Sequence, residues 1–293
     1  MMSHCYGGAK AALATMHGKA SAIAPAMASH LGLEIVTPVG IDTDALGTFT
    51  GETPRIGTMR EVAIRKARLG MRASRLNIGI ASEGSFGPHP VIPFLHVGME
   101  LMVFVDDERN RIITESLVAE QANYDVATAA DISELDAFLG RVRFPTHGLI
   151  VRPNQTDSPW WKLHPELVRT CKGVATRDSL AYAISEAARV SEDRRAQVMT
   201  DMRAHMNPTR MKTISDLAAR LARRVATECP ACGTPGFGRI AFSAGIPCAV
   251  CGTESIVPGG DLMGCATCDC ELETRHIPVR EYAEAGECPR CNP

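Results

Sequence analysis

The feature that most constrains this chain is a series of paired cysteines near its C-terminal end. Of eleven cysteines, nine lie between Cys229 and Cys291, and eight of these form four Cys-x-x-Cys pairs. Two thiolates on one tight turn bind a zinc ion from one side, and a second such turn completes a tetrahedral site. The pairs therefore predict two closed zinc sites. The predicted ligands are Cys229, Cys232, Cys248, Cys251, Cys265, Cys268, Cys288 and Cys291.

The order of the pairs along the chain leaves two zinc arrangements open. The simplest joins the first pair to the second and the third to the fourth. A cross-braced arrangement instead joins the first pair to the third and the second to the fourth. Cys270 is left over and is an alternative ligand to Cys268. In either arrangement protein fills all four positions around each ion, so we expect structural rather than catalytic zinc.

The composition changes abruptly at Cys229, which predicts two domains, residues 1–227 and 228–293. The second is rich in Cys, Gly and Pro and too short for a core of its own, so we predict a double zinc ribbon that folds around metal. From Cys229 onward the chain carries eight acidic residues against four arginines. This charge balance disfavours binding to DNA phosphates. We expect the ribbons to dock a partner protein, mediate self-association or cover a substrate.

The cysteines also bear on the cellular compartment. An odd cysteine count, the Cys-x-x-Cys spacing and an N-terminus without a charged-then-apolar signal pattern argue against a disulfide framework. No run approaches the roughly 18 to 20 apolar residues that a membrane span requires. We therefore expect a cytoplasmic protein without membrane contact.

The first 227 residues alternate short apolar runs with helical periodicity, which predicts an α/β domain. Strands are predicted at residues 11–16, 33–39, 77–81, 100–106, 111–119, 124–128, 148–152 and 197–200, with the three from 100 to 128 forming a meander. Helices are predicted at residues 20–31, 59–72, 133–140, 177–190 and 209–226. The Gly- and Pro-rich run 82–93 predicts a loop.

Three polar clusters stand at positions where open α/β sheets place their ligands. In Thr15–Lys19 a hydroxyl, a lysine and the N–H groups of a helix start can together hold a phosphate, although an ordinary strand-to-helix turn has the same pattern. Glu61 follows the long loop and also completes a capping box with Thr58. In Ser82–Gly87, Glu83 leaves an apolar strand directly before a glycine, which packing explains poorly.

Together these clusters resemble a known superfamily. Thr58–Ala67 (TMREVAIRKA) resembles the T-F-x-E-N-A-x-x-K-A helix of the inosine/xanthosine triphosphate pyrophosphatase superfamily. Ala14–Lys19 resembles its opening A-T-x-N-x-x-K segment, and Ile80–Ser85 (IASEGS) is similar to its metal-binding acidic strand end. His17 and Val62 replace two asparagines of the pattern, and the first segment is one residue shorter. Over roughly residues 11–120 the resemblance implies an ITPase/Maf-like fold, a three-layer or two-lobed α/β domain with a mixed sheet.

The same resemblance implies a site in which Mg²⁺ and a nucleotide are held while water attacks a phosphorus atom. The implied catalytic residues are Glu61, Glu83, Lys19 and His17, with Glu61 and Glu83 holding the Mg²⁺. The implied phosphate-binding residues are Thr15, Lys66 and Ser85. His17 or His89 is expected to transfer a proton.

A further basic cluster precedes the last predicted helix. Asn207 before Pro208 predicts a helix N-cap with proline in the first turn. Arg203, His205 and Arg210 then lie near the positive end of that helix, where a phosphate or carboxylate binds well. A capped surface helix with solvated arginines is the plainer interpretation, and RNA contact is a third.

The whole chain is identified as a member of a bacterial family of unknown function on four segments. These are Gly47–Glu52 (GTFTGE), Ser82–Pro90 (SEGSFGPHP), Asp201–Met211 (DMRAHMNPTRM) and Cys229–Gly238 (CPACGTPGFG). Membership of that family implies no activity.

Two functional hypotheses follow from the sequence. The leading one is a Mg²⁺-dependent hydrolase, a pyrophosphatase or phosphohydrolase, of a nucleotide or related phosphate ester, with the zinc ribbons as a docking module. The alternative is a non-catalytic zinc-ribbon adaptor whose α/β domain binds a nucleotide or RNA. The retained Glu61 and Glu83 favour the hydrolase, whereas the replaced asparagines favour the adaptor.

Overall fold

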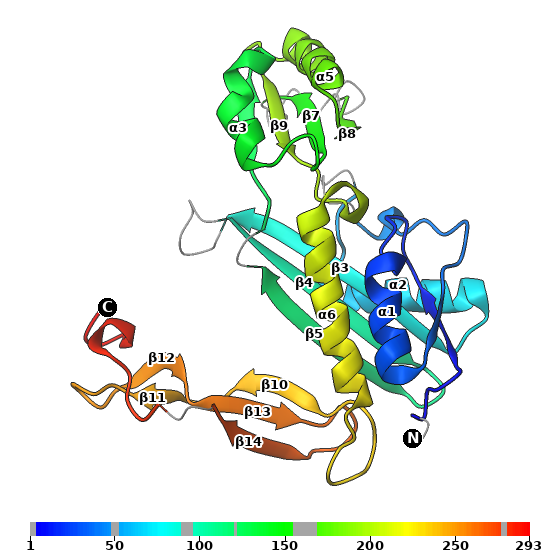
Figure 1. Ribbon diagram of the computed structural model, residues 1–293, viewed down its shortest axis with the longest axis vertical. Helices are drawn as coiled ribbons and strands as arrows, with labels where there is room; N and C mark the ends of the chain where they lie inside the picture. Colours follow the sequence, from blue (N-terminus) through cyan, green and yellow to red (C-terminus); the bar gives the residue numbers. More distant parts are fainter. Residues whose placement is uncertain (1–3, 48–52, 89–95, 120–121, 155–168, 277–279) are drawn as a thin grey trace.

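The protein consists of a central α/β body, a smaller α/β lobe and an extended C-terminal tail (Figure 1). The computed structural model describes residues 4–47, 53–88, 96–119, 122–154, 169–276 and 280–293. His89 and residues 48–52 of the GTFTGE segment lie outside these ranges. Within them, no helix has the length and apolar character needed to cross a bilayer.

A five-stranded mixed sheet forms the centre of the body, which confirms the predicted α/β class and mixed sheet. Its strands are β1 (Lys10–Leu13), β2 (Glu34–Val36), β3 (Ile78–Pro88), β4 (His96–Asp106) and β5 (Arg111–Ala119). Their order is β2-β1-β3-β4-β5. The first three strands are parallel, and β4 and β5 run antiparallel to their neighbours.

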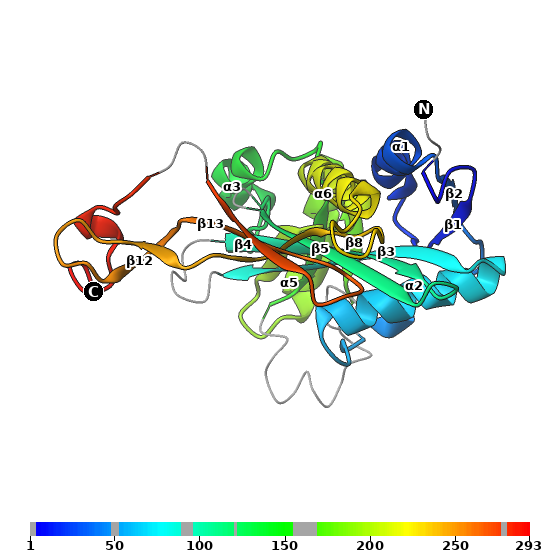
Figure 2. The same cartoon turned by 90° about the horizontal axis from the view of Figure 1, so that it is seen from below.

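Three helices cover the two faces of this sheet. α1 (Ala20–Leu31) and α6 (Pro208–Ala226) lie side by side on one face, and α2 (Met59–Ser74) lies on the other (Figures 1 and 2). α2 begins where predicted, at the capping box formed by Thr58 and Glu61. The core beneath α1 and α6 includes Ile23, Phe104 and Leu217, each fully buried.

The predicted loop over residues 82–93 is wrong for residues 82–88, because β3 continues through Pro88 and pairs residue by residue with β4. The glycine at position 84 serves a close approach rather than a turn. A Cβ added to Gly84 would meet the Arg210 guanidinium at 2.5 Å and the Glu100 carboxylate at 2.8 Å. Glycine therefore lets two charged side chains cross the strand.

The smaller lobe has its own sheet and core. Its strands are β6 (Val126–Ala129), β7 (Leu149–Pro153), β8 (Cys171–Val174) and β9 (Ala196–Thr200), in the order β6-β9-β7-β8. α3 (Asp136–Arg141) and α5 (Arg177–Val190) accompany them. The predicted meander over residues 100–128 is wrong in its third strand, because β6 pairs with β9 in this lobe and not with β5. Burial of Val151, Leu180 and Val198 gives the lobe an independent core.

The tail contains two small antiparallel sheets. β10 (Gly238–Phe242), β13 (Gly260–Gly264) and β14 (Glu271–Arg275) form one, and β11 (Gly245–Pro247) and β12 (Glu254–Pro258) form the other. Short 3-10 turns lie at Asp44–Leu46, Ile132–Leu135, Ala204–Met206 and Ala285–Glu287. The tail extends beneath the body from the C-terminal end of α6 (Figure 1).

Candidate functional site

The topology of the central sheet creates a crevice beside β1. The chain passes from β1 to β2 through α1 on one face, and from β2 to β3 through α2 on the other. β1 therefore lies between two connections that leave in opposite directions, and such switch points are where open sheets bind ligands. β1 pairs with β3 only as far as Leu13 and Ile80, whereas β3 runs on to Pro88.

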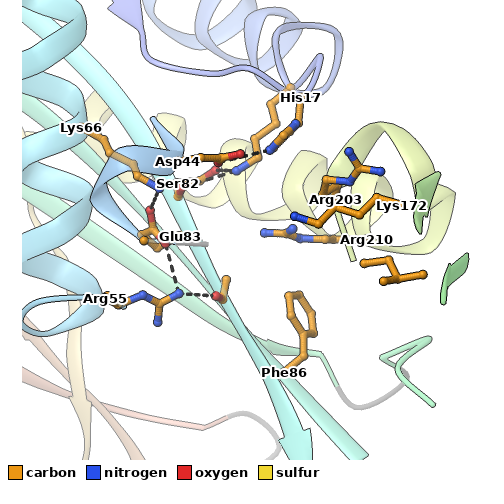
Figure 3. A pocket seen from close by; sticks show the side chains of 14 residues that line it. His17, Asp44, Arg55, Lys66, Ser82, Glu83, Phe86, Lys172, Arg203 and Arg210 are labelled. Atoms are coloured by element: carbon orange, nitrogen blue, oxygen red, sulfur yellow. Dashed lines mark hydrogen bonds and ion pairs between the residues drawn. The ribbon is translucent and has the colours of Figure 1, made fainter. Parts of the chain in front are cut away.

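A strongly basic pocket of about 70 Å³ occupies this crevice. Its residues come from the loops after β1 and β2, from α2, β3 and the start of α6, and from β7 and β8 of the smaller lobe (Figure 3). The cationic lining residues are Lys19, Arg55, Lys66, Lys172, Arg203 and Arg210. Among the described residues, two acidic ones, Asp44 and Glu83, line the same pocket. Both lobes of the molecule thus face one cation-rich space.

Glu83 lies at the α2 side of the pocket, where two cations neutralise it. Glu83 is only 5% exposed. It forms an ion pair with the buried Lys66 ammonium, and the Arg55 guanidinium donates to its second oxygen at 3.2 Å (Figure 3). A buried carboxylate needs such partners, because an unpaired charge in the interior is costly. Lys66 and Glu83 therefore both line the pocket, but their charges are paired with each other.

Glu61 has a different position. Its carboxylate accepts hydrogen bonds from the backbone N–H and the hydroxyl of Thr58, at 2.8 and 3.0 Å. These bonds, the backbone bond above all, lower the pKa of Glu61. Glu61 is exposed and does not line the pocket, so its described role is to cap α2. Among the described residues, the only groups of three or more metal-binding side chains are made of cysteines, so the predicted magnesium site gains no support.

Arg210 forms the opposite wall. Its Nε donates to Glu100 at 2.5 Å, its Nη1 donates to the Met202 carbonyl, and its guanidinium lies 4.9 Å from the Phe86 ring centre. Glu100 is fully buried. The pair fixes the guanidinium plane at the pocket. Sequence reasoning missed Glu100, although a lone glutamate in the apolar strand β4 was a usable signal.

Lys19 projects between these two walls. Its ammonium donates to the Ser82 hydroxyl at 3.0 Å and to the Ser82 carbonyl at 3.4 Å. Burial, with help from the nearby Arg210 charge, lowers the pKa of Lys19 to about 8. Lys19 therefore carries a positive charge at neutral pH, and an anionic ligand would stabilise that charge.

One histidine, His17, lines the pocket, and a second, His205, packs against it. The His17 Nε2 lies 3.5 Å from an Asp44 oxygen, and its ring stacks on His205 with centroids 5.1 Å apart. Burial is the main cause that lowers the pKa of His17 to about 4, and burial also lowers the pKa of His205. Both rings are thus neutral at pH 7, and a neutral imidazole can accept a proton.

The predicted N-cap before α6 is confirmed. The Asn207 side chain accepts from the Arg210 backbone N–H at 2.9 Å, with Pro208 in the first turn. Arg203 is fixed by the fully buried Asp201, whose carboxylate also accepts from the backbone N–H of Gly173 in β8. The contact ties the smaller lobe to the pocket wall and places Lys172 beside Arg203 (Figure 3).

The structure thus brings together part of the predicted set. His17, Lys19, Lys66, Glu83, Arg203 and Arg210 line the pocket, whereas Glu61, Thr15, Ser85 and His205 do not. The Thr15 hydroxyl accepts from the His17 backbone N–H, and Ser85 is exposed on β3. Sequence reasoning missed Asp44, Arg55 and Lys172, which stand in loops and short strands without a recognisable motif.

The eight predicted zinc ligands form two clusters, and the sequential pairing is wrong. One cluster contains Cys229, Cys232, Cys265 and Cys268, and the other contains Cys248, Cys251, Cys288 and Cys291. The arrangement is cross-braced, with the first pair joined to the third and the second to the fourth. Cys268, not Cys270, completes the first cluster.

The sulfur geometry fits zinc. A tetrahedral ion with Zn–S bonds of about 2.3 Å has sulfur–sulfur edges of about 3.8 Å. The sulfurs of Cys229 and Cys268 are 3.8 Å apart, and those of Cys232 and Cys265 are 3.7 Å apart. In the second cluster, Cys248–Cys291 and Cys251–Cys288 measure 3.9 and 3.6 Å. These distances suit one ion held by four thiolates in each cluster.

Arg224 joins the body to the first ribbon, which is the part of the tail around the Cys229 cluster. Its side chain, near the C-terminal end of α6, donates to the Thr114 carbonyl at 2.9 Å and to the Glu115 carboxylate at 3.0 Å. It also donates to the carbonyls of Gly236 and Arg239 in the ribbon. One helix, α6, therefore carries the pocket residue Arg210 and the ribbon contact Arg224.

These features define an α/β protein of two lobes with a cross-braced pair of four-cysteine metal sites. The chain belongs to the family described as Domain of unknown function (DUF6671), whose model matches residues 66–293. No curated protein and no solved structure matches it. These comparisons therefore do not show that the chain shares the fold of the triphosphate pyrophosphatase superfamily.

Proposed function

We propose that this protein binds and hydrolyses a phosphate-bearing small molecule, a nucleotide or a related ester, in the pocket beside β1. One observation carries the proposal: six cationic side chains from both lobes line a single pocket at the switch point of the sheet. Among the described residues two acids, Asp44 and Glu83, line the pocket beside these six cations, and two buried acids, Glu100 and Asp201, lie behind it. The excess of cationic side chains suits an anionic ligand such as a phosphate.

The cations differ in what they can do for a phosphate. Arg203 and Arg210 are held by buried carboxylates, and a guanidinium fixed in this way can present its remaining N–H groups to phosphate oxygens. Lys19 donates to neutral oxygens of Ser82 and can turn toward an anion at little cost. We therefore assign the phosphate to the space between Lys19, Arg203 and Arg210.

Hydrolysis needs a proton acceptor near the attacking water, and His17 fits that role. Its ring is neutral at pH 7, and Asp44 beside Nε2 favours a proton on that nitrogen and leaves Nδ1 to accept. The water oxygen bonds to phosphorus while its proton passes to His17. The bond between phosphorus and the leaving oxygen breaks, and the pocket cations stabilise the charge that develops. Mg²⁺ would enter bound to the ligand phosphates, because Lys66 and Arg55 already neutralise Glu83.

Phosphate release is the test. Purified zinc-loaded protein is incubated with nucleoside mono-, di- and triphosphates and simple phosphate esters, with and without added Mg²⁺. We expect release from at least one of them, and we expect His17→Asn to slow it by about 10²- to 10⁴-fold. His30→Asn, on the exposed side of α1, is the matched control and should leave the rate unchanged. Full activity of His17→Asn would contradict the proposed proton transfer.

A second candidate is the non-catalytic adaptor. The ion pairs that Glu83 forms with Lys66 and Arg55 favour this candidate, because a carboxylate paired with two cations is a poor magnesium ligand. This candidate predicts that phosphate-bearing ligands bind to the pocket and are recovered intact. Binding without turnover across the whole panel would therefore decide for the adaptor.

A further inference from the structure

Among the strands that the structure describes, β14 forms an open edge in the tail. It is the last strand in the order β10-β13-β14, and all five of its residues are exposed. In Figure 1 it lies at the lower margin of the tail, and in Figure 2, seen from below, it lies in front of the body. Both views leave the outer edge of β14 facing away from the described part of the α/β body.

The hydrogen-bond pattern shows which backbone groups point outward. Cys265 donates to the Cys270 carbonyl at 3.1 Å, and His276 donates to the Gly259 carbonyl at 2.9 Å. In an antiparallel ladder bonded pairs alternate with non-bonded pairs, so Leu272 and Thr274 also bond toward β13. The backbone groups of the residues between them therefore point outward. Those residues are Glu271, Glu273 and Arg275.

We propose that β14 pairs with β14 of a second copy of this chain, antiparallel and centred on Glu273. In this register Glu271 lies opposite Arg275 of the partner, and Arg275 lies opposite the partner's Glu271. The two strands would share about six backbone hydrogen bonds, because each of three facing residue pairs exchanges two. The two three-stranded sheets would then form one continuous sheet around a two-fold axis, the commonest symmetry of soluble dimers.

The charge sequence of the strand selects this partner. In the centred register two attractive pairs flank one like-charged pair, Glu273 against Glu273, and all three outward residues of each strand have a facing residue. A two-residue slip that places Glu273 opposite Arg275 keeps two attractive pairs but leaves only two facing pairs within the described strand. A one-residue slip would place Glu271 opposite a Thr274 of the second copy and lose both attractive pairs. Charged residues on an edge also resist pairing with unrelated strands. The edge is therefore selective for its own sequence.

The interface is small, so the dimer should be weak. A five-residue edge buries far less than the roughly 1,200 Å² of stable complexes. Half-exposed Leu272, which lies opposite Thr274 of the second copy in this register, adds some apolar contact across the junction. We expect a dissociation constant above about 1 μM. The association does not depend on the proposed hydrolysis, since β14 contributes nothing to the pocket.

Sedimentation velocity of the full zinc-loaded chain, from low to high micromolar concentration, tests the proposal. We expect a reversible monomer–dimer equilibrium. Arg275→Glu places glutamate opposite Glu271 twice and should weaken association at least tenfold. The double variant Glu271→Arg/Arg275→Glu restores opposite charges and should restore association. Arg72→Glu, an equal charge change on α2, should leave association unchanged.

A backbone variant separates edge pairing from folding. Glu273→Pro removes an outward N–H without removing a hydrogen bond to β13, so the zinc content should stay at two per chain while dimerisation is lost. Glu273→Gln removes the central repulsion and should strengthen the dimer. A wild-type chain that stays monomeric throughout, or a dimer that Arg275→Glu leaves unchanged, would overturn the proposal.

Discussion

The α/β body and the C-terminal tail are held together by different forces. In the body, α1 and α6 bury Ile23, Phe104 and Leu217 completely against the sheet. In the tail, every residue of β14 is exposed, and buried side chains gather around the cysteine clusters. Apolar burial thus stabilises the first region, whereas the second has two four-cysteine clusters that suit stabilisation by bound metal. One chain therefore combines a region that folds by burial of apolar side chains with a region whose fold depends on its cysteine clusters.

The largest expected effect follows from removing metal. Metal analysis should find two zinc ions per chain, and Cys229→Ser should leave one. Because the sites are cross-braced, this variant should raise amide hydrogen exchange around Cys265 and Cys268 while the segment around Cys248 stays protected. Helices of the body, such as α1, should be unaffected. Loss of protection at Cys248 and Cys251 instead would support the sequential pairing.

The next effect contrasts the same substitution in the two regions. Leu217→Ala leaves a cavity in the core of the body and should lower the free energy of unfolding by about 2–5 kcal/mol. Leu272→Ala in β14, where the side chain is 47% exposed, should change it by less than about 1 kcal/mol. Chemical denaturation of the zinc-loaded variants measures both. Equal losses would show that the tail has an apolar core after all.

The junction between the regions gives a smaller effect. Arg224→Met removes hydrogen bonds from α6 to β5 and to the first ribbon, and should cost about 1–3 kcal/mol. It should also raise exchange at the amides of β10 without releasing zinc. Arg223→Met, its exposed neighbour, is the matched control. If the two variants behave alike, the ribbon is held to the body by other contacts.

The smallest expected effect is a pH dependence at the pocket. Burial lowers the pKa of Lys19 to about 8, and a bound anion should raise it again. If Lys19 is neutral in the free protein, binding of the anion is therefore accompanied by uptake of one proton by Lys19. Affinity should be constant below pH 8 and fall by at most about tenfold per pH unit above it, until the pKa of the complex is reached. Calorimetric titration from pH 7 to pH 9.5 would show a flat profile if Lys19 does not contact the anion.

Local rules predicted much of the body. α1 and α5 begin and end where the sequence placed them, and the cap residues Thr58 and Asn207 mark the starts of α2 and α6. These predictions succeed because capping and periodicity act over a few residues. The same holds for the zinc ligands, whose spacing within each pair is local.

What failed depends on contacts distant in sequence. The partner of each cysteine pair is set by how the tail folds back, which spacing alone does not determine. The extension of β3 depends on pairing with β4 and on charged side chains that cross Gly84. Arg55 and Lys172 reach the pocket from segments that carry no motif, and Lys172 does so from the smaller lobe. The ion pair between Glu83 and Lys66 likewise depends on the packing of α2 beside β3.

The central claim is that the basic pocket beside β1 binds a phosphate-bearing small molecule. Isothermal titration of the zinc-loaded chain with the nucleotide and phosphate-ester panel tests it most directly, with Lys19→Met and the surface control Lys10→Met measured alongside. We predict binding of at least one compound, a loss of at least about tenfold, or 1.4 kcal/mol, in Lys19→Met, and no change in Lys10→Met. Absence of binding across the panel, or equal affinity of Lys19→Met and the unaltered protein, would contradict the account.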